Sequence, residues 1–147
     1  MRLRRIPAGV PLASLLRDRR DPAERGPSED ELLGSWSATR WQYTSSSRPD
    51  RVVDVVCDLG GSVTLSLSAG TWVLTWDLDG RGIQSLGGAL TMDDDHLVLL
   101  AQDASEAERV LYRLAERTLA LSCETSSWDF DGNGDEPAGF VAVLVRL

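Results

Sequence analysis

Hydrophobic and polar residues alternate most clearly in the middle of the chain, where the pattern is typical of strands with one buried face. Between residues 62 and 68, valine and leucine hold every second position, and the others are serine or threonine. Between residues 71 and 77, tryptophan and leucine recur with the same period. Ala69-Gly70 separates the two segments and is typical of a tight hairpin turn. The pattern therefore predicts two neighbouring antiparallel strands that bury one continuous apolar face.

Further strand-like segments follow one another with turn residues between them. The ranges in which we expect strands are 35–44, 52–57, 62–68, 71–77, 85–92, 96–101, 118–123 and 140–147. The apolar run 52–57 is also short enough to be a helical turn. Regular spacing of this kind is typical of an up-and-down barrel or a sandwich. Because a single sheet hides its edges by closing on itself, the fold class we predict is an all-β, antiparallel up-and-down β-barrel of about eight strands.

Residues 106–116 fit two patterns. Ser105 and Glu108 form a capping box, and the apolar residues that follow recur at helical spacing, which favours a helix. Val110, Tyr112 and Leu114 also alternate, which favours a strand. We favour the strand, because the segments on both sides follow the strand pattern.

The beginning of the chain differs from the rest. Ser28 and Glu31 form a capping box that predicts a short helical turn over 29–33, after which Gly34 permits a reversal of the backbone. Residues 21–30 have the proline, glycine and charge content of a linker. We therefore expect residues 1–28 to be a basic, flexible N-terminal arm and residues 29–147 to be the barrel domain.

Charge and composition limit the partners. The formal net charge is −8 and the sequence pI is about 4.6, so nucleic acid and anionic membrane surfaces would repel the protein. All fifteen basic residues are arginine, and the absence of lysine removes Schiff-base chemistry and the P-loop lysine. We predict that nucleic acid is not a partner.

The same composition bears on location. No segment approaches the ~20 apolar residues that a transmembrane helix needs. The arginine-rich start is followed by an apolar stretch that two prolines and a glycine interrupt, which is a poor match to a signal peptide. We expect a cytoplasmic protein without a transmembrane segment, and an exported one if the start site is misassigned.

The sequence offers little support for catalysis. His96 is the only histidine, so every Ser-His-Asp or Cys-His arrangement would have to use it. It follows three aspartates at the start of a predicted strand, which is typical of a polar turn residue. We expect that the protein is not an enzyme.

The chain resembles the bacterial lipocalin-like proteins. The segments that carry the likeness are Leu33-Gly34-Ser35-Trp36, residues 61–67 with Gly70-Thr71-Trp72, residues 88–90 with 95–99, and residues 129–138 leading into 143–146. The resemblance implies an eight-stranded barrel with an open end and an interior that holds a small apolar molecule. It also implies that Trp36 packs beneath Arg146 in a cation–π contact at the closed end, next to Gly34.

On this basis we expect non-catalytic binding of a small hydrophobic molecule. The residues predicted to form the cavity wall are Leu65, Leu67, Trp72, Leu74 and Trp76. The alternative is a barrel filled by its own side chains. Such a barrel would act as a protein-interaction scaffold, with the N-terminal arm as its docking element for a protein partner.

The acidic segment 129–136 is a candidate calcium loop. Asp129, Asp131 and Asn133 stand at alternate positions before Gly134, as in the first half of a calcium-binding loop, and Asp135 could add its backbone carbonyl. Phe140 stands where a bidentate glutamate is expected. The other interpretation is a solvated hairpin turn, for which such residues are equally typical.

Cys57 and Cys123 lie on apolar segments. They could form a disulfide in an oxidising compartment, or remain free as two buried thiols. We favour free thiols, since nothing else in the sequence argues for export.

Overall fold

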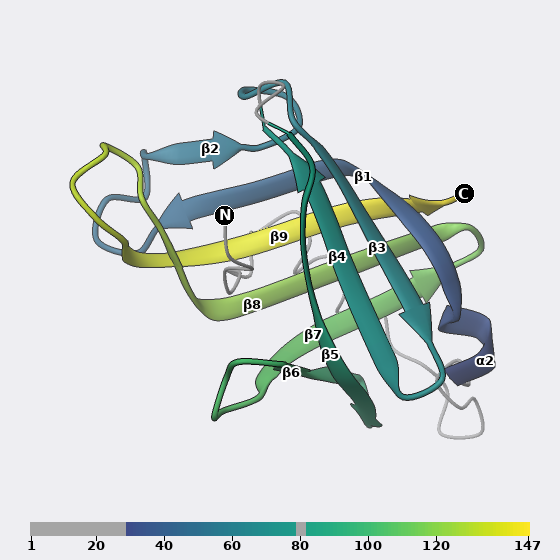
Figure 1. The fold of residues 1–147 in the computed structure, drawn as a ribbon. Coiled ribbons are helices and arrows are strands. Elements are labelled where there is room, and N and C mark those ends of the chain that lie inside the picture. Colours follow the sequence, from purple (N-terminus) through teal and green to yellow (C-terminus); the bar gives the residue numbers. More distant parts are fainter. Residues whose placement is uncertain (1–28, 79–81) are drawn as a thin grey trace.

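The computed structural model describes residues 29–78 and 82–147, and it consists of one helical turn and one antiparallel sheet (Figure 1). The predicted N-terminal arm lies outside the described residues, as do residues 79–81. The elements are α2 (Glu29–Leu32), β1 (Gly34–Ser45), β2 (Val52–Asp54), β3 (Ser62–Ser68), β4 (Thr71–Asp77), β5 (Gln84–Asp93), β6 (His96–Ala101), β7 (Glu108–Ala115), β8 (Thr118–Trp128) and β9 (Glu136–Arg146). Among the described residues, no helix has the length and apolar character that crossing a membrane requires.

The sheet closes because β1 pairs with β9 along almost its whole length, from Trp36 opposite Arg146 to Ser45 opposite Ala138. Strands β3 to β9 follow one another in chain order, so β1 and β3–β9 form a closed, eight-stranded antiparallel barrel (Figure 1). β2 is an additional strand that pairs with the end of β1, beyond the residues that pair with β3. The predicted fold class is confirmed.

A bulge in β1 changes which residues face inward. The register between β1 and β9 shifts between Ala38 and Arg40. As a result, Trp36 and Ala38 are buried before the shift, and Trp41 and Tyr43 are buried after it. The bulge thus lets even-numbered and then odd-numbered side chains of one strand enter the core.

Three hairpins at one end of the barrel have two-residue turns. They join β3 to β4, β5 to β6 and β7 to β8, with the flanking residues directly paired. Each turn contains one residue with positive φ, namely Gly70 (76°), Asp94 (55°) and Glu116 (56°). Asp94 and Asp95 therefore form the β5–β6 turn, directly after Asp93 at the end of β5. The connections 102–107 and 129–135 at the other end are longer.

Residues 108–115 form β7, so the strand interpretation is confirmed and the helical one is wrong. β7 pairs with both β6 and β8, and these ladders satisfy its backbone better than an isolated helical turn would. Val110 and Tyr112 are 4% and 2% exposed, respectively, and both point into the barrel. The capping-box residue Ser105 lies in the exposed connection before the strand.

The run 52–57 combines both of its predicted forms. Val52–Asp54 is a strand, and the chain then turns. One carboxylate oxygen of Asp54 accepts hydrogen bonds from the backbone N–H groups of Trp41, Val56 and Cys57, at 3.2, 3.0 and 3.3 Å. The side chain of Asp54 thus ends β2 and anchors the turn that follows β2 onto β1.

Aromatic side chains fill the interior beside β1, β8 and β9. The rings of Trp41 and Phe140 meet edge to face at 4.4 Å, and those of Tyr43 and Trp128 stack at 4.5 Å. The indole nitrogen of Trp41 donates to the hydroxyl of Tyr43 at 3.1 Å. This part of the barrel is a packed core.

The opposite end is capped by the contact that the resemblance implies. The guanidinium of Arg146 lies 4.2 Å from the centroid of the Trp36 ring, and it donates to the backbone carbonyls of Leu33, at 2.8 Å, and Glu31. The indole of Trp36 donates to the carbonyl of Leu32 at 3.0 Å. Gly34 has φ 128°, and a Cβ there would lie 2.8 Å from Arg146 Nη1, so the cap requires a glycine.

We expect Arg146→Ala to destabilise the protein by about 2–4 kcal/mol, because it removes the cation–π contact and leaves two carbonyls of α2 and the following residue without their donor. Equilibrium unfolding in urea would measure the loss. Arg48→Ala, in the exposed β1–β2 connection, is the control and should change the free energy of unfolding by less than ~0.5 kcal/mol. Equal unfolding midpoints for both variants would refute a structural role for the cap.

Candidate ligand-binding pocket

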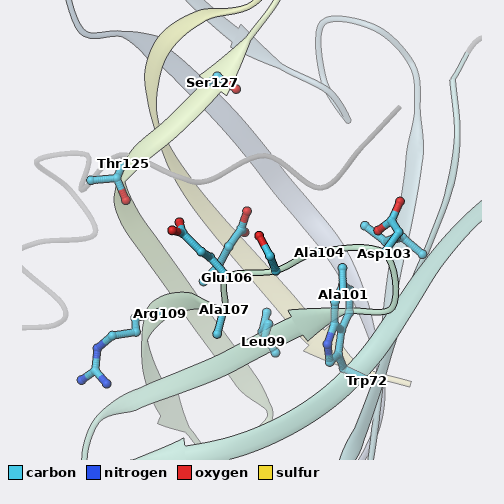
Figure 2. Close-up of a pocket in the computed structure, with 13 residues that line it drawn as sticks. Trp72, Leu99, Ala101, Asp103, Ala104, Glu106, Ala107, Arg109, Thr125 and Ser127 are labelled. Atoms are coloured by element: carbon cyan, nitrogen blue, oxygen red, sulfur yellow. The ribbon is translucent and has the colours of Figure 1, made fainter.

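A pocket of about 600 Å³ opens between the β6–β7 connection and the end of β8 (Figure 2). Its apolar wall consists of Trp72 from β4, Leu86 from β5, and Leu99 and Ala101 from β6. Residues 103–109 and two residues of β8, Thr125 and Ser127, complete the lining. The pocket thus has apolar side chains on one side, and polar groups make up more than half of its accessible lining.

Two small residues stand opposite one another on β5 and β6, beside the pocket wall. Gly88 on β5 lies directly opposite Trp72, and Ala101 on β6 lies directly opposite Gly88, so two neighbouring inward positions lack large side chains. A Cβ on Gly88 would lie 1.8 Å from the carbonyl oxygen of Leu100, so only glycine fits there. In addition, β6 ends at Ala101 and β7 begins at Glu108, so the segment between them bridges the two strands without extending their ladder.

The polar rim is acidic. Asp103, Glu106 and Glu108 contribute carboxylates, and Arg109 is the one cation among the described lining residues. The guanidinium of Arg109 is held by Asp93 at 2.6 Å, and this hydrogen bond and ion pair lower the pKa of Asp93 below its ordinary value. Glu108 stands opposite Leu99 in the β6–β7 ladder, on the inward side of the barrel.

Trp72 adds a buried hydrogen-bond donor to the wall. Its side chain is 1% exposed, and its indole nitrogen has no hydrogen-bond partner among the described residues. The indole nitrogen of Trp76 is in the same state, but Trp76 does not line the pocket. Since a buried unsatisfied donor costs about 1–3 kcal/mol, an acceptor placed at the Trp72 N–H would lower the free energy of the folded protein.

The predicted cavity-wall residues divide into two groups. Trp72 lines the pocket, whereas Leu65, Leu67, Leu74 and Trp76 are buried in the hydrophobic core and are not part of this lining. Sequence reasoning missed Leu99, Ala101 and residues 103–109. The signals that could have found them are the glycine pair Gly87-Gly88 within a strand and the acidic, small-residue stretch after β6.

The carboxylates of the 129–136 segment bind neighbouring groups of the protein. Asp129 accepts from the Gly132 N–H at 2.7 Å, and Asp131 accepts from the Asn133 N–H at 3.0 Å and lies 3.5 Å from Arg51. The Asn133 hydrogen bond, and then Arg51, lower the pKa of Asp131. Within residues 29–78 and 82–147, no group of three or more His, Cys, Asp or Glu side chains could hold a metal ion. The geometry, including Asp135 nearby in the same segment, therefore gives the calcium hypothesis no support.

His96 lies at the start of β6, where its Nδ1 is 2.9 Å from a carboxylate oxygen of Asp95. It is paired with Asp93 across the tight β5–β6 turn. His96 and the two cysteines are not among the residues that line the pocket. The position of His96 beside the β5–β6 turn agrees with the interpretation of a polar turn residue.

Cys57 and Cys123 are free thiols, as expected. The expectation that both are buried is wrong for Cys57, which is exposed because β2 ends at Asp54 and the chain turns outward. The negative charge of Asp54 is the main cause that raises the pKa of the Cys57 thiol above its ordinary value.

Alkylation of Cys57 should therefore need a higher pH than an ordinary thiol with a pKa near ~8.5. The thiolate is the reactive form, so a raised pKa moves the rise of the rate to higher pH. The rate of iodoacetamide modification, followed by mass spectrometry in a Cys123→Ser variant, would measure the profile. A midpoint at or below that of free cysteine in the same buffer would refute the effect of Asp54.

No family model matches this chain, and comparison with curated proteins and with solved structures gives no significant match.

Proposed function

We propose that the protein is a non-catalytic binding protein for a small, predominantly apolar molecule, which it holds in the pocket beside Trp72. The observation that carries this proposal is a pocket of about 600 Å³ that Trp72, Leu86, Leu99 and Ala101 border on one side, a volume within the range of small-molecule sites. Binding would be driven by removal of apolar ligand surface from water, at roughly 25 cal/mol per Å².

The proposal includes a lipocalin-like mode of binding, in which the barrel is the container. It is supported by the closed eight-stranded barrel and by the cap of Trp36 and Arg146 at one end. The aromatic cluster around Tyr43 and Phe140 fills the interior beside β1, β8 and β9, so the ligand would occupy only the part of the barrel near β5 and β6. This division favours a ligand-binding protein over a barrel that is filled throughout.

The experiment that tests the proposal compares the native mass of the purified protein with its denatured mass. A recurrent excess of the size of a small organic molecule would support the proposal and identify the chemical class of the ligand. The protein would then be titrated with that molecule, and binding would be followed by calorimetry. Equal native and denatured masses, together with no binding heat from a panel of apolar molecules, would overturn the proposal.

We expect Ala101→Leu to weaken binding by at least roughly tenfold, because the larger side chain would occupy the space opposite Gly88. Ala89→Leu is the matched control: the same change is made on β5 at an exposed position next to Gly88, and binding should stay the same. Calorimetric titration of both variants measures the effect. Equal loss in the two variants, or no loss in either, would place the ligand elsewhere.

A further inference from the structure

The polar groups of the pocket lie in two places that would contact different parts of a ligand. One is the indole N–H of Trp72, which belongs to the buried wall. The others are the carboxylates of Asp103, Glu106 and Glu108 in the segment that borders the opening. Figure 2 shows Trp72 beside Leu99 and Ala101, with Asp103 and Glu106 on the neighbouring connection. A ligand that fills the pocket would meet both.

The Trp72 N–H selects for an acceptor. It is buried and has no partner among the described residues, and Figure 2 shows the indole nitrogen at the edge of the ring toward Leu99, another residue of the lining. A ligand with a carbonyl, ether or hydroxyl oxygen at that place would satisfy the donor without displacing a protein contact. A pure hydrocarbon would leave the donor unsatisfied.

The rim selects for positive charge. Asp103 and Glu106 place two exposed carboxylates in the described lining, and the guanidinium of Arg109 beside them is already paired with Asp93 at 2.6 Å. The whole chain is acidic as well, with a net charge of −8. A ligand with a carboxylate would bring a further negative charge to this rim, whereas a protonated amine would be attracted to it.

From these two features we infer that the pocket selects an apolar amine that carries a hydrogen-bond acceptor, with the acceptor at Trp72 and the protonated nitrogen at the carboxylates of the β6–β7 connection. The inference rests on the proposed function and adds the chemical class of the ligand. It excludes fatty acids as the preferred class.

The charge requirement is tested with three probes that share one carbon chain: octylamine, octanol and octanoate. We expect octylamine to bind most tightly and octanoate least tightly in calorimetric titrations at pH 7. The advantage of octylamine should shrink in 0.5 M salt, because Asp103 and Glu106 are exposed and salt screens the attraction of exposed charges.

A double variant locates the charge effect. Asp103→Asn with Glu106→Gln should weaken the affinity for octylamine by roughly two- to fivefold per carboxylate and leave the affinity for octanol unchanged. Asp50→Asn with Glu116→Gln makes the same chemical changes at exposed positions outside the lining and should affect neither probe. Equal effects of the two double variants would mean that only the net charge of the protein matters, and would overturn the assignment to the rim.

The acceptor requirement is tested with N-octanoyl-ethylenediamine, which adds an amide carbonyl to an amine. Its affinity relative to octylamine should fall roughly three- to tenfold in Trp72→Phe, which keeps an aromatic ring and removes the N–H. Trp76→Phe removes an equally buried, unpartnered N–H outside the lining and should leave the ratio unchanged. The change of side-chain shape in Trp72→Phe affects both probes, so it cancels in the ratio of their affinities. An unchanged ratio in Trp72→Phe would overturn this part of the inference.

The outcomes separate this inference from the proposed function. Octanoate binding as tightly as octylamine, with both weakened by Ala101→Leu, would overturn the inference and leave the proposed function standing. The same holds if the purified protein carries an apolar acid as excess native mass. The absence of any excess mass and of any binding by the three probes would overturn both.

Discussion

The structure depends on the pairing of its first long strand with its last. β1 and β9 are separated by most of the domain in sequence, yet they pair from Trp36 and Arg146 at one end to Ser45 and Ala138 at the other. This ladder joins the two edges of the sheet. The sheet thereby closes into a barrel with an enclosed interior. The cation–π contact and the carbonyl bonds of Arg146 secure the ladder where it begins and bind α2 to it.

The position of the pocket follows from an uneven distribution of side-chain size around the closed barrel. The strands beside the closure contribute bulky aromatic rings, and the bulge in β1 allows both Trp36 and Trp41 to point inward. On the other side, Gly88 and Ala101 stand next to each other at inward positions. A barrel of about eight strands has just enough interior for side chains, so a pair of small residues leaves space that a ligand can use. The backbone carbonyl of Leu100 takes the place that a Cβ on Gly88 would need, so the glycine allows β5 and β6 to approach closely.

Period-2 alternation was sufficient to predict the strands at residues 62–68 and 71–77, because each pairs on both sides and buries one face. It could not predict which inward side chains would line a pocket. The set of lining side chains depends on the tilt of the strands and on where each ladder ends. Both are set only when the sheet closes, so local sequence does not reveal them. Leu74 and Trp72 have the same alternation in the sequence, but only Trp72 lies opposite Gly88. Local pattern also failed at Cys57, where Asp54 ends the strand early and turns the thiol outward.

The buried tryptophans differ in whether their indole nitrogens have partners within the protein. The indole nitrogens of Trp36 and Trp41 donate to partners within the protein, a backbone carbonyl of α2 and the hydroxyl of Tyr43, and both rings lie in regions that hold the barrel together. The indole nitrogen of Trp72 is as deeply buried, has no partner among the described residues, and lies at the pocket. The indole nitrogen of Trp76 is in the same state outside the lining, so a buried donor without a partner does not by itself mark the pocket. Under the proposed function, a ligand acceptor bound to the Trp72 N–H would stabilise the folded barrel, and occupancy of the pocket would then raise its stability.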